Sequence, residues 1–127
     1  MVRLRALVIA GIAIAAGSCG GSSSGTVPSP ADNPNQMTIS ATGVLTPSEL
    51  TIAPGTRVLF INNHVQSHYI ASDPHPEHTD CPEMDQVGVL APGQRRESGN
   101  FVTVRTCGLH DHNDPLNRSL WARIVIK

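Results

Sequence analysis

Apolar and polar residues alternate along much of the chain after residue 36, which is the pattern of half-buried β-strands. The segments that alternate, or that are rich in β-branched and apolar residues, are 37–42, 49–53, 56–61, 68–71, 87–90, 100–106 and 121–126. Turns are marked by Pro54-Gly55 and Pro92-Gly93. Helical periodicity is limited to a short turn at 83–87. The pattern therefore predicts an all-β sandwich or barrel.

The beginning of the chain lacks this alternation and carries the features of an export signal. Arg3 and Arg5 precede an apolar run at 7–16 that is too short to span a bilayer, and small residues follow it. We therefore expect residues 1–18 to be a signal peptide. The mature protein would then work outside the cytoplasm, at the periplasmic or cell-surface face of a bacterial membrane, where disulfides persist.

Cys19 directly follows the small residues of this signal. The arrangement resembles the lipobox of bacterial lipoproteins, although Ala16 stands where Leu is usual. The resemblance implies that Cys19 carries a lipid that anchors the chain to the membrane; ordinary cleavage nearby, leaving an unanchored protein, is the alternative. Residues 20–36 are rich in Gly, Ser and Pro, so 19–36 is expected to be a flexible tether before a folded domain at 37–127.

Composition and charge narrow the range of partners. The chain of 127 residues has a net charge of −1 with neutral His and no block of like charge, which disfavours nucleic acid as a partner. Aromatic residues are only 3% of the chain, so the core must be built mainly from aliphatic side chains. No nucleophile or acid–base pair stands at a recognisable catalytic spacing. We therefore expect a monomeric binding protein rather than an enzyme.

The expected domain contains all six histidines, and four of them lie in two polar segments, 72–86 and 108–119, that are expected to be loops. Imidazole is a common ligand for copper, zinc and nickel, so this concentration predicts a metal site. His75 is a candidate ligand, and His78 could complete the same site or bind a second ion. His64 lies in a turn-like Asn-Asn-His stretch and is expected to face solvent.

His110 and His112 are two residues apart in the sequence that follows Cys107. On an extended segment these two side chains would share one face, and Asp111 would point to the other. Both histidines are candidate ligands. Asp111 is then either a carboxylate that orients a ligand imidazole or a solvated loop acid.

An ordered set of segments resembles the cupredoxin family over residues 43–127. The segments that carry the resemblance are Thr46-Pro47, 50–62, His68, Pro92-Gly93, Cys107-Gly-Leu-His110 and the closing strand at 122–126. The resemblance implies a Greek-key β-sandwich that binds copper. It also implies that His68, Cys107 and His110 are the copper ligands, with a weak axial Met or a substitute.

The sequence departs from the family pattern at three points. No Met follows His110, and Leu120 occupies the axial position, where it cannot bind a metal. The ligand loop is longer than usual, and Cys81 offers Cys107 a disulfide partner. Cys107 is thus either a copper thiolate or half of a disulfide that closes a loop of about 26 residues, worth about 3.5 kcal/mol on the chain-entropy model.

These alternatives imply different functions. With a thiolate, the resemblance implies one-electron transfer to a redox protein partner. With the disulfide, the metal would be held by His68, His110 and either His112 or His75, which suits copper capture, delivery or tolerance and a copper-transfer partner. A metal-free sandwich that acts as an interaction module is the third hypothesis.

Overall fold

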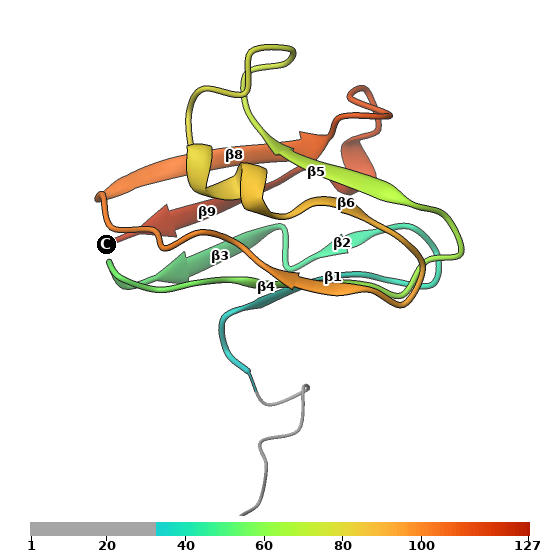
Figure 1. Ribbon diagram of the computed structural model, residues 1–127, viewed down its shortest axis with the longest axis horizontal. Helices are drawn as coiled ribbons and strands as arrows, with labels where there is room; N and C mark the ends of the chain where they lie inside the picture. The colour runs from blue at the N-terminus through green and yellow to red at the C-terminus, as the bar shows by residue number, and fades with distance from the viewer. Residues whose placement is uncertain (1–32) are drawn as a thin grey trace, which may run out of the picture.

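The computed structural model describes residues 33–127, which form two β-sheets packed face to face (Figure 1). One sheet has the strand order β2-β1-β4-β7 and the other has the order β3-β9-β8-β5-β6. The strands are β1 (Gln36–Ile39), β2 (Leu45–Thr46), β3 (Glu49–Ile52), β4 (Leu59–Asn62), β5 (His68–Ser72), β6 (Gly88–Leu90), β7 (Arg95–Glu97), β8 (Arg105–Asp111) and β9 (Ala122–Ile126). Two 3-10 turns lie between strands: η2 (Pro82–Gln86) and η3 (Arg118–Leu120). The expected all-β Greek-key sandwich is confirmed.

The core lies between the two sheets and follows the alternation in the sequence. In β3, Leu50 and Ile52 are buried while Glu49 and Thr51 are exposed. Leu50 pairs in register with Ile124 of β9, and both are buried, so aliphatic side chains line the inner face of the five-stranded sheet. Met37 and Ile39 of β1 are buried on the inner side of the other sheet. The two Phe residues of the chain, Phe60 and Phe101, are fully buried in the same core.

The structure differs from the sequence-based strand assignment in three places. The strand expected at 100–106 begins only at Arg105, because Phe101 forms a single bridge to Thr56 and Val102 and Val104 are exposed. β7 was not expected, since all three of its residues are polar and exposed. β8 continues to Asp111 and so occupies the start of the segment at 108–119 that was expected to be a loop.

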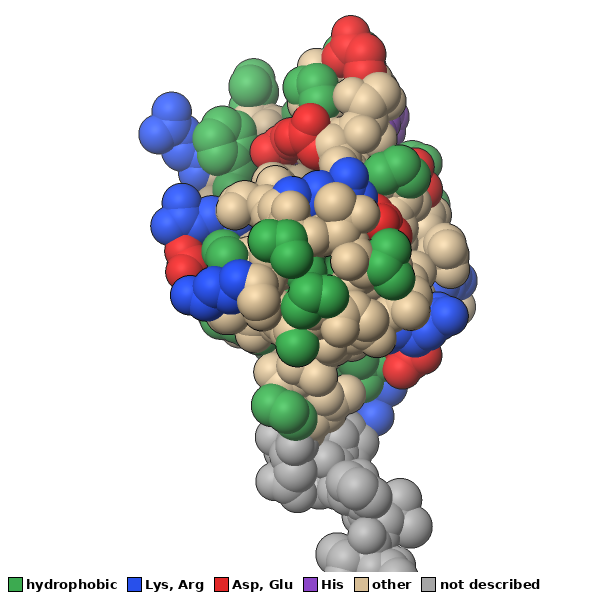
Figure 2. All heavy atoms as spheres, turned by 90° about the vertical axis from the view of Figure 1, so that its left-hand side faces the viewer, with side chains coloured by type: hydrophobic (Ala, Val, Ile, Leu, Met, Phe, Trp, Pro, Cys, Tyr) green, Lys and Arg blue, Asp and Glu red, His purple; other side chains and the backbone are tan. Residues whose placement is uncertain are grey.

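The long polar segment that follows β5 lies above the five-stranded sheet. In Figure 1 this segment rises over β5 and β8 on the side away from β1 and β4. Figure 2 looks onto the end of the sandwich where the C-terminus lies, and shows acidic, basic and hydrophobic side chains interspersed with only a small histidine patch at one edge. This end of the sandwich therefore presents little histidine to solvent.

The N-terminal predictions concern residues that the structure does not describe. The expected signal peptide at 1–18, the expected lipidation site Cys19 and the tether as far as residue 32 lie outside the described residues. Between residues 33 and 127, none of the helices has the length and apolar character needed to cross a membrane.

Candidate metal centre

Cys81 and Cys107 form a disulfide with a Cα–Cα distance of 5.8 Å, and both residues are fully buried. Cys107 comes from the middle of β8, and Cys81 directly precedes η2. A sulfur atom bonded to another sulfur is not the thiolate that a copper ligand must be. In this structure Cys107 is therefore not a metal ligand, and the disulfide alternative is the one observed.

The ligand set implied by the cupredoxin resemblance does not come together in this structure. Because β8 stays extended through His110, side chains three residues apart point to opposite faces of the sheet, and Cys107 and His110 do so. His68 of β5 contacts Asp111, which is on the same face as Cys107. His68 and His110 are thus separated by the sheet, and the expectation that they share one metal with Cys107 is corrected.

Four histidines instead gather on the outer face of the five-stranded sheet, and we call them the histidine cluster: His75, His78, His110 and His112. The ring centroids of His78 and His112 are 4.8 Å apart, and His75 lies 5.0 Å from His112. His110 lies 5.2 Å from His78 and 5.4 Å from His75. One nitrogen from each of His75, His78 and His112 lies within 4.8 Å of the others, which suits a shared ion.

The pairing of β8 with β5 explains the positions of His110 and His112. Ala71 pairs with His110 in register, and the Tyr69 ring lies 4.9 Å from the His112 ring, so both histidines sit above β5 on the same face. Asp111 points to the opposite face, as the two-residue alternation predicts. The sequence-based expectation that His110 and His112 share a face therefore agrees with the structure.

The loop after β5 brings the other two histidines. His78 is held over the sheet because its Nδ1 lies 2.7 Å from the Ser72 carbonyl oxygen, which leaves its Nε2 pointing to His112 Nδ1 at 2.7 Å. His78 itself adopts a positive φ of 54°, and its backbone N–H donates to the Pro74 carbonyl at 2.7 Å. The sequence predicts His78 only as an optional ligand, since no local pattern specifies the conformation of its loop.

His110 is buried and oriented by an acid. Its Nδ1 lies 2.7 Å from Asp73 Oδ1, and the imidazole is only 4% exposed. Its other nitrogen, Nε2, is buried and has no hydrogen-bond partner within the described part of the chain. A buried imidazole nitrogen without a partner is unfavourable in a metal-free protein, and a carboxylate on the opposite nitrogen is the usual companion of a metal-binding histidine.

His75 completes the cluster from its exposed side. Desolvation, and then charge repulsion from His112, His110 and His78, lower the pKa of His75 below its ordinary value. The lowered pKa favours the neutral ring, which is the form that binds a metal. His75 and His110 also line a cavity of about 180 Å³ beside Trp121, so an ion could reach the cluster from solvent.

The absence of a side chain at Gly108 leaves room for the Asp73 carboxylate. A Cβ atom at Gly108 would overlap the Asp73 carboxylate, while the Asp73 backbone N–H donates to the Gly108 carbonyl at 3.0 Å. We expect Gly108→Ala to push Asp73 away from His110 and to weaken metal binding by about tenfold, the lower end of the range for lost outer partners of ligands. Val104→Ala, at an exposed position just before β8, should leave metal affinity unchanged. Equal affinities for Gly108→Ala and wild type would contradict this role.

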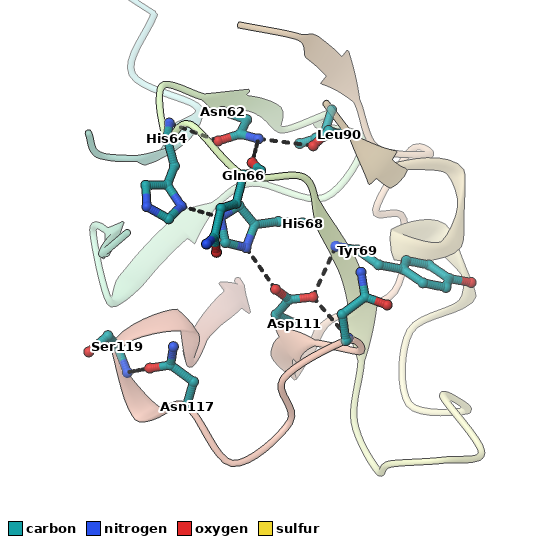
Figure 3. Close-up of polar contacts among 10 residues, drawn as sticks. Asn62, His64, Gln66, His68, Tyr69, Leu90, Asp111, Asn117 and Ser119 are labelled. Atoms are coloured by element: carbon teal, nitrogen blue, oxygen red, sulfur yellow. Dashed lines mark hydrogen bonds and ion pairs between the residues drawn. The ribbon is translucent and has the colours of Figure 1, made fainter. Parts of the chain in front are cut away.

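The remaining two histidines lie on the other face. His64 was expected to face solvent, but it is half-buried, and its Nδ1 lies 2.8 Å from His68 Nε2. His68 Nδ1 in turn lies 2.7 Å from Asp111 Oδ2 (Figure 3). The four-residue spacing of His64 and His68 across a turn was the available sequence signal for this contact.

Comparison with known proteins identifies the fold. No protein-family model and no curated protein matches the sequence. Among solved structures, a purple cupredoxin from Nitrosopumilus maritimus is 19% identical with a TM-score of 0.55, over 72% of this chain and 98% of that one. Plastocyanin from Dryopteris crassirhizoma is 17% identical with a TM-score of 0.54, over 72% and 99%. Amicyanin from Paracoccus versutus is 15% identical with a TM-score of 0.54, over 72% and 79%. The sandwich of this chain therefore has the cupredoxin fold.

Proposed function

We propose that this protein binds copper through the histidine cluster. The observation that carries the proposal is the group His75, His78 and His112, each of which offers one nitrogen within 4.8 Å of the others. The His110 ring packs against two of these imidazoles, and its buried Nε2 has no hydrogen-bond partner among the described residues. An imidazole-rich donor set suits copper, and two similar solved structures are named with copper: an amicyanin variant described with Cu(I) and a Cu-containing nitrite reductase. A bound copper ion would supply redox and ligand-exchange chemistry.

The residues of the histidine cluster differ in how firmly their imidazole rings are positioned. His78 Nδ1 contacts the Ser72 carbonyl oxygen, so its Nε2 is the preorganised ligand of the group. His110 is oriented beside this group by Asp73. His112 offers Nδ1, and His75 offers an exposed ring with a lowered pKa. Exposed ligands can be exchanged, which is what uptake and release of an ion require.

We infer that the role is copper capture and delivery, or copper tolerance, rather than electron transfer. The electron-transfer expectation depended on a Cys107 thiolate, and in the structure the Cys107 sulfur is bonded to Cys81. A buried disulfide also supports a location outside the cytoplasm, in line with the signal expected at residues 1–18. A lipid on Cys19 would hold the protein at a membrane, where it could pass copper to a protein partner.

Copper loading tests the proposal. The purified protein should retain Cu(II) after desalting and show no intense thiolate-to-copper charge-transfer band in the visible spectrum. The double variant His78→Ala/His112→Ala should bind the cluster copper at least about 100-fold more weakly, since direct ligands matter at least as much as their outer partners. Titration with a competing chelator measures the affinity.

The matched control for this experiment is Asn63→Ala, an exposed position outside the cluster that should bind like wild type. An intense visible band on copper loading would contradict the imidazole site. Unchanged affinity in the double variant would place the copper elsewhere.

A further inference from the structure

Two exposed valines stand at one end of the sandwich. Val102 is 60% exposed and Val104 is 67% exposed, and both lie between the fully buried Phe101 and the start of β8. The neighbouring turn adds Ala53 and Pro54, which are also exposed. We call Ala53, Pro54, Val102 and Val104 the apolar tip. Apolar side chains that gather on a surface mark an interaction site more often than singly scattered ones do.

The apolar tip is held in this position by hydrogen bonds on both sides. The backbone N–H of Phe101 donates to the Thr56 carbonyl at 2.9 Å, and the N–H of Gly55 donates to the Phe101 carbonyl at 2.8 Å. These bonds bring the turn beside the segment that carries the valines. On the other side of that segment, Arg105 begins β8 and pairs with Ile126 of β9. The valines therefore stay at the surface, because the backbone on both sides of them belongs to the fold.

The described chain enters the sandwich at the end where the apolar tip lies. Gln36 begins β1 and pairs with Leu59, the first residue of β4, and the turn of the apolar tip connects β3 to β4. Cys19, the expected lipidation site, is separated from Asn33 by residues 20–32. A segment of that length that is rich in Gly and Ser has an end-to-end distance of about 20 Å. A lipid on Cys19 would therefore keep this end of the sandwich near the bilayer surface.

The histidine cluster lies toward the opposite end of the five-stranded sheet. Val104 directly precedes β8, and His110 is the sixth residue of that seven-residue strand. A rise of about 3.3 Å per residue places the two about 20 Å apart along the sheet. His112 follows the last residue of β8 and lies farther along the chain from Val104. A bilayer at the apolar tip would thus leave the cluster directed at the aqueous side, where a copper-transfer partner would meet it.

Charged residues of both signs surround the apolar tip. Arg57 and Lys127 are exposed bases at this end, and Glu97, which pairs with Leu59, is an exposed acid. Figure 2 looks onto this end and shows hydrophobic side chains in its middle, with charged side chains mainly around them. Attraction to anionic lipids takes a cluster of bases, which is absent from this end of the described chain. We therefore expect contact with a bilayer to be apolar and to need no anionic lipid.

We propose that the apolar tip is a membrane-contact surface, which lies against the headgroup region of a phospholipid bilayer once a lipid on Cys19 anchors the chain. The proposal depends on the membrane anchor of the proposed function and is independent of copper binding. Side chains as few and small as these bury too little apolar area to hold a free protein at a bilayer. The anchor raises the effective concentration of bilayer around the tip, so that a weak contact becomes populated. The contact then sets the orientation of the domain.

Paramagnetic broadening of methyl signals tests this orientation. Cys19 is the only cysteine outside the disulfide, so the full chain can be coupled there to a maleimide-bearing lipid in phosphatidylcholine nanodiscs, which supplies the anchor directly. With a gadolinium-bearing lipid in the nanodisc, the methyl signals of Val102 and Val104 should lose most of their intensity. The methyl signals of Val65, which is 80% exposed in the turn after β4 at the opposite end, should keep theirs.

A matched pair of variants identifies the side chains responsible. Val102→Ser/Val104→Ser should return most of the intensity of the Ala53 methyl signal, which is broadened in wild type. The control Val44→Ser/Val89→Ser also replaces two exposed valines, at 39% and 49% exposure, and should leave the broadening of Ala53 unchanged. Chelator titration of Val102→Ser/Val104→Ser should give the wild-type copper affinity, so failure of the membrane contact and failure of the copper site are separate results.

Four results would overturn the proposal. Equal broadening of Val65 and Val102 would show that the domain has no fixed orientation, and the absence of broadening at both would show that it stays clear of the bilayer. Broadening of Ala53 that persists in Val102→Ser/Val104→Ser would show that other residues make the contact. Dilution-dependent shifts of the Val102 and Val104 signals without nanodiscs would show that a second copy of the chain covers the apolar tip.

Discussion

The double variant Cys81→Ala/Cys107→Ala should lose more than about 3.5 kcal/mol of unfolding free energy relative to the disulfide-bonded protein, because that value counts the bond alone. The bond joins residues 26 positions apart, so it removes a large share of the freedom of the unfolded chain between them. In a small domain this contribution is a large part of the total stability, because the core alone supplies limited stability. Denaturant unfolding of both metal-free proteins, at one pH and temperature, measures the difference.

Two controls distinguish the stability contributed by the disulfide bond from that contributed by the packing of the cysteine side chains. Both cysteines are fully buried, so the alanine variant also loses core contacts, whereas the wild-type protein in reductant loses only the bond. Peptide mapping of the unreduced protein should find residues 81 and 107 in one linked fragment. Free thiols at both positions, with an unfolding free energy equal to that of the variant, would show that the bond does not form.

The same variant should bind copper more weakly at the histidine cluster. Cys81 lies three residues after His78 and ties the loop carrying His75 and His78 to β8, which carries His110. Without the bond, part of the binding energy is spent on ordering this loop. The affinity measured by chelator competition should therefore fall severalfold.

Much of the fold could be predicted from the sequence because alternation reports burial directly. Residues 49–53 alternate, and β3 is found there with Leu50 and Ile52 inward. The prediction fails where a strand forms through its hydrogen bonds to a neighbouring strand although its own sequence does not alternate. β7 is a strand of charged residues whose hydrogen bonds to β4 create it, and no local pattern marks such a strand.

The sequence could predict that histidines of this domain bind a metal, but it could not predict which of them lie together. The histidines of two polar segments indicated a metal, but the division into two groups depends on the length of β8. Because the strand runs through His110, the side chains of His110 and Asp111 fall on opposite faces, one with the loop histidines and one with His68. The cupredoxin resemblance grouped His68 with His110 through the Cys107-Gly-Leu-His110 spacing, which does not show how far the strand runs.

Asp111→Ala should be among the most destabilising single substitutions in the protein, with a loss of about 3–5 kcal/mol. The change removes the acceptor of three hydrogen bonds and leaves His68 and two backbone N–H groups buried without a partner. The Asp111 side chain is only 3% exposed, so water cannot replace the carboxylate. Denaturant unfolding of the metal-free variant measures the loss.

Asp73→Ala provides the matched comparison, because Asp73 contacts His110 at the same 2.7 Å but from a side chain that is 47% exposed. Water can take the place of that carboxylate, so the unfolding free energy should fall by only about 1 kcal/mol or less. Copper affinity should respond in the opposite order: Asp73→Ala should weaken the histidine cluster by about 10–100-fold, since His110 loses its orienting partner. Two acid–imidazole contacts of equal length would then differ in role because burial, rather than distance, decides whether the carboxylate holds the fold together or tunes a ligand. Equal losses of stability in the two variants would contradict that division.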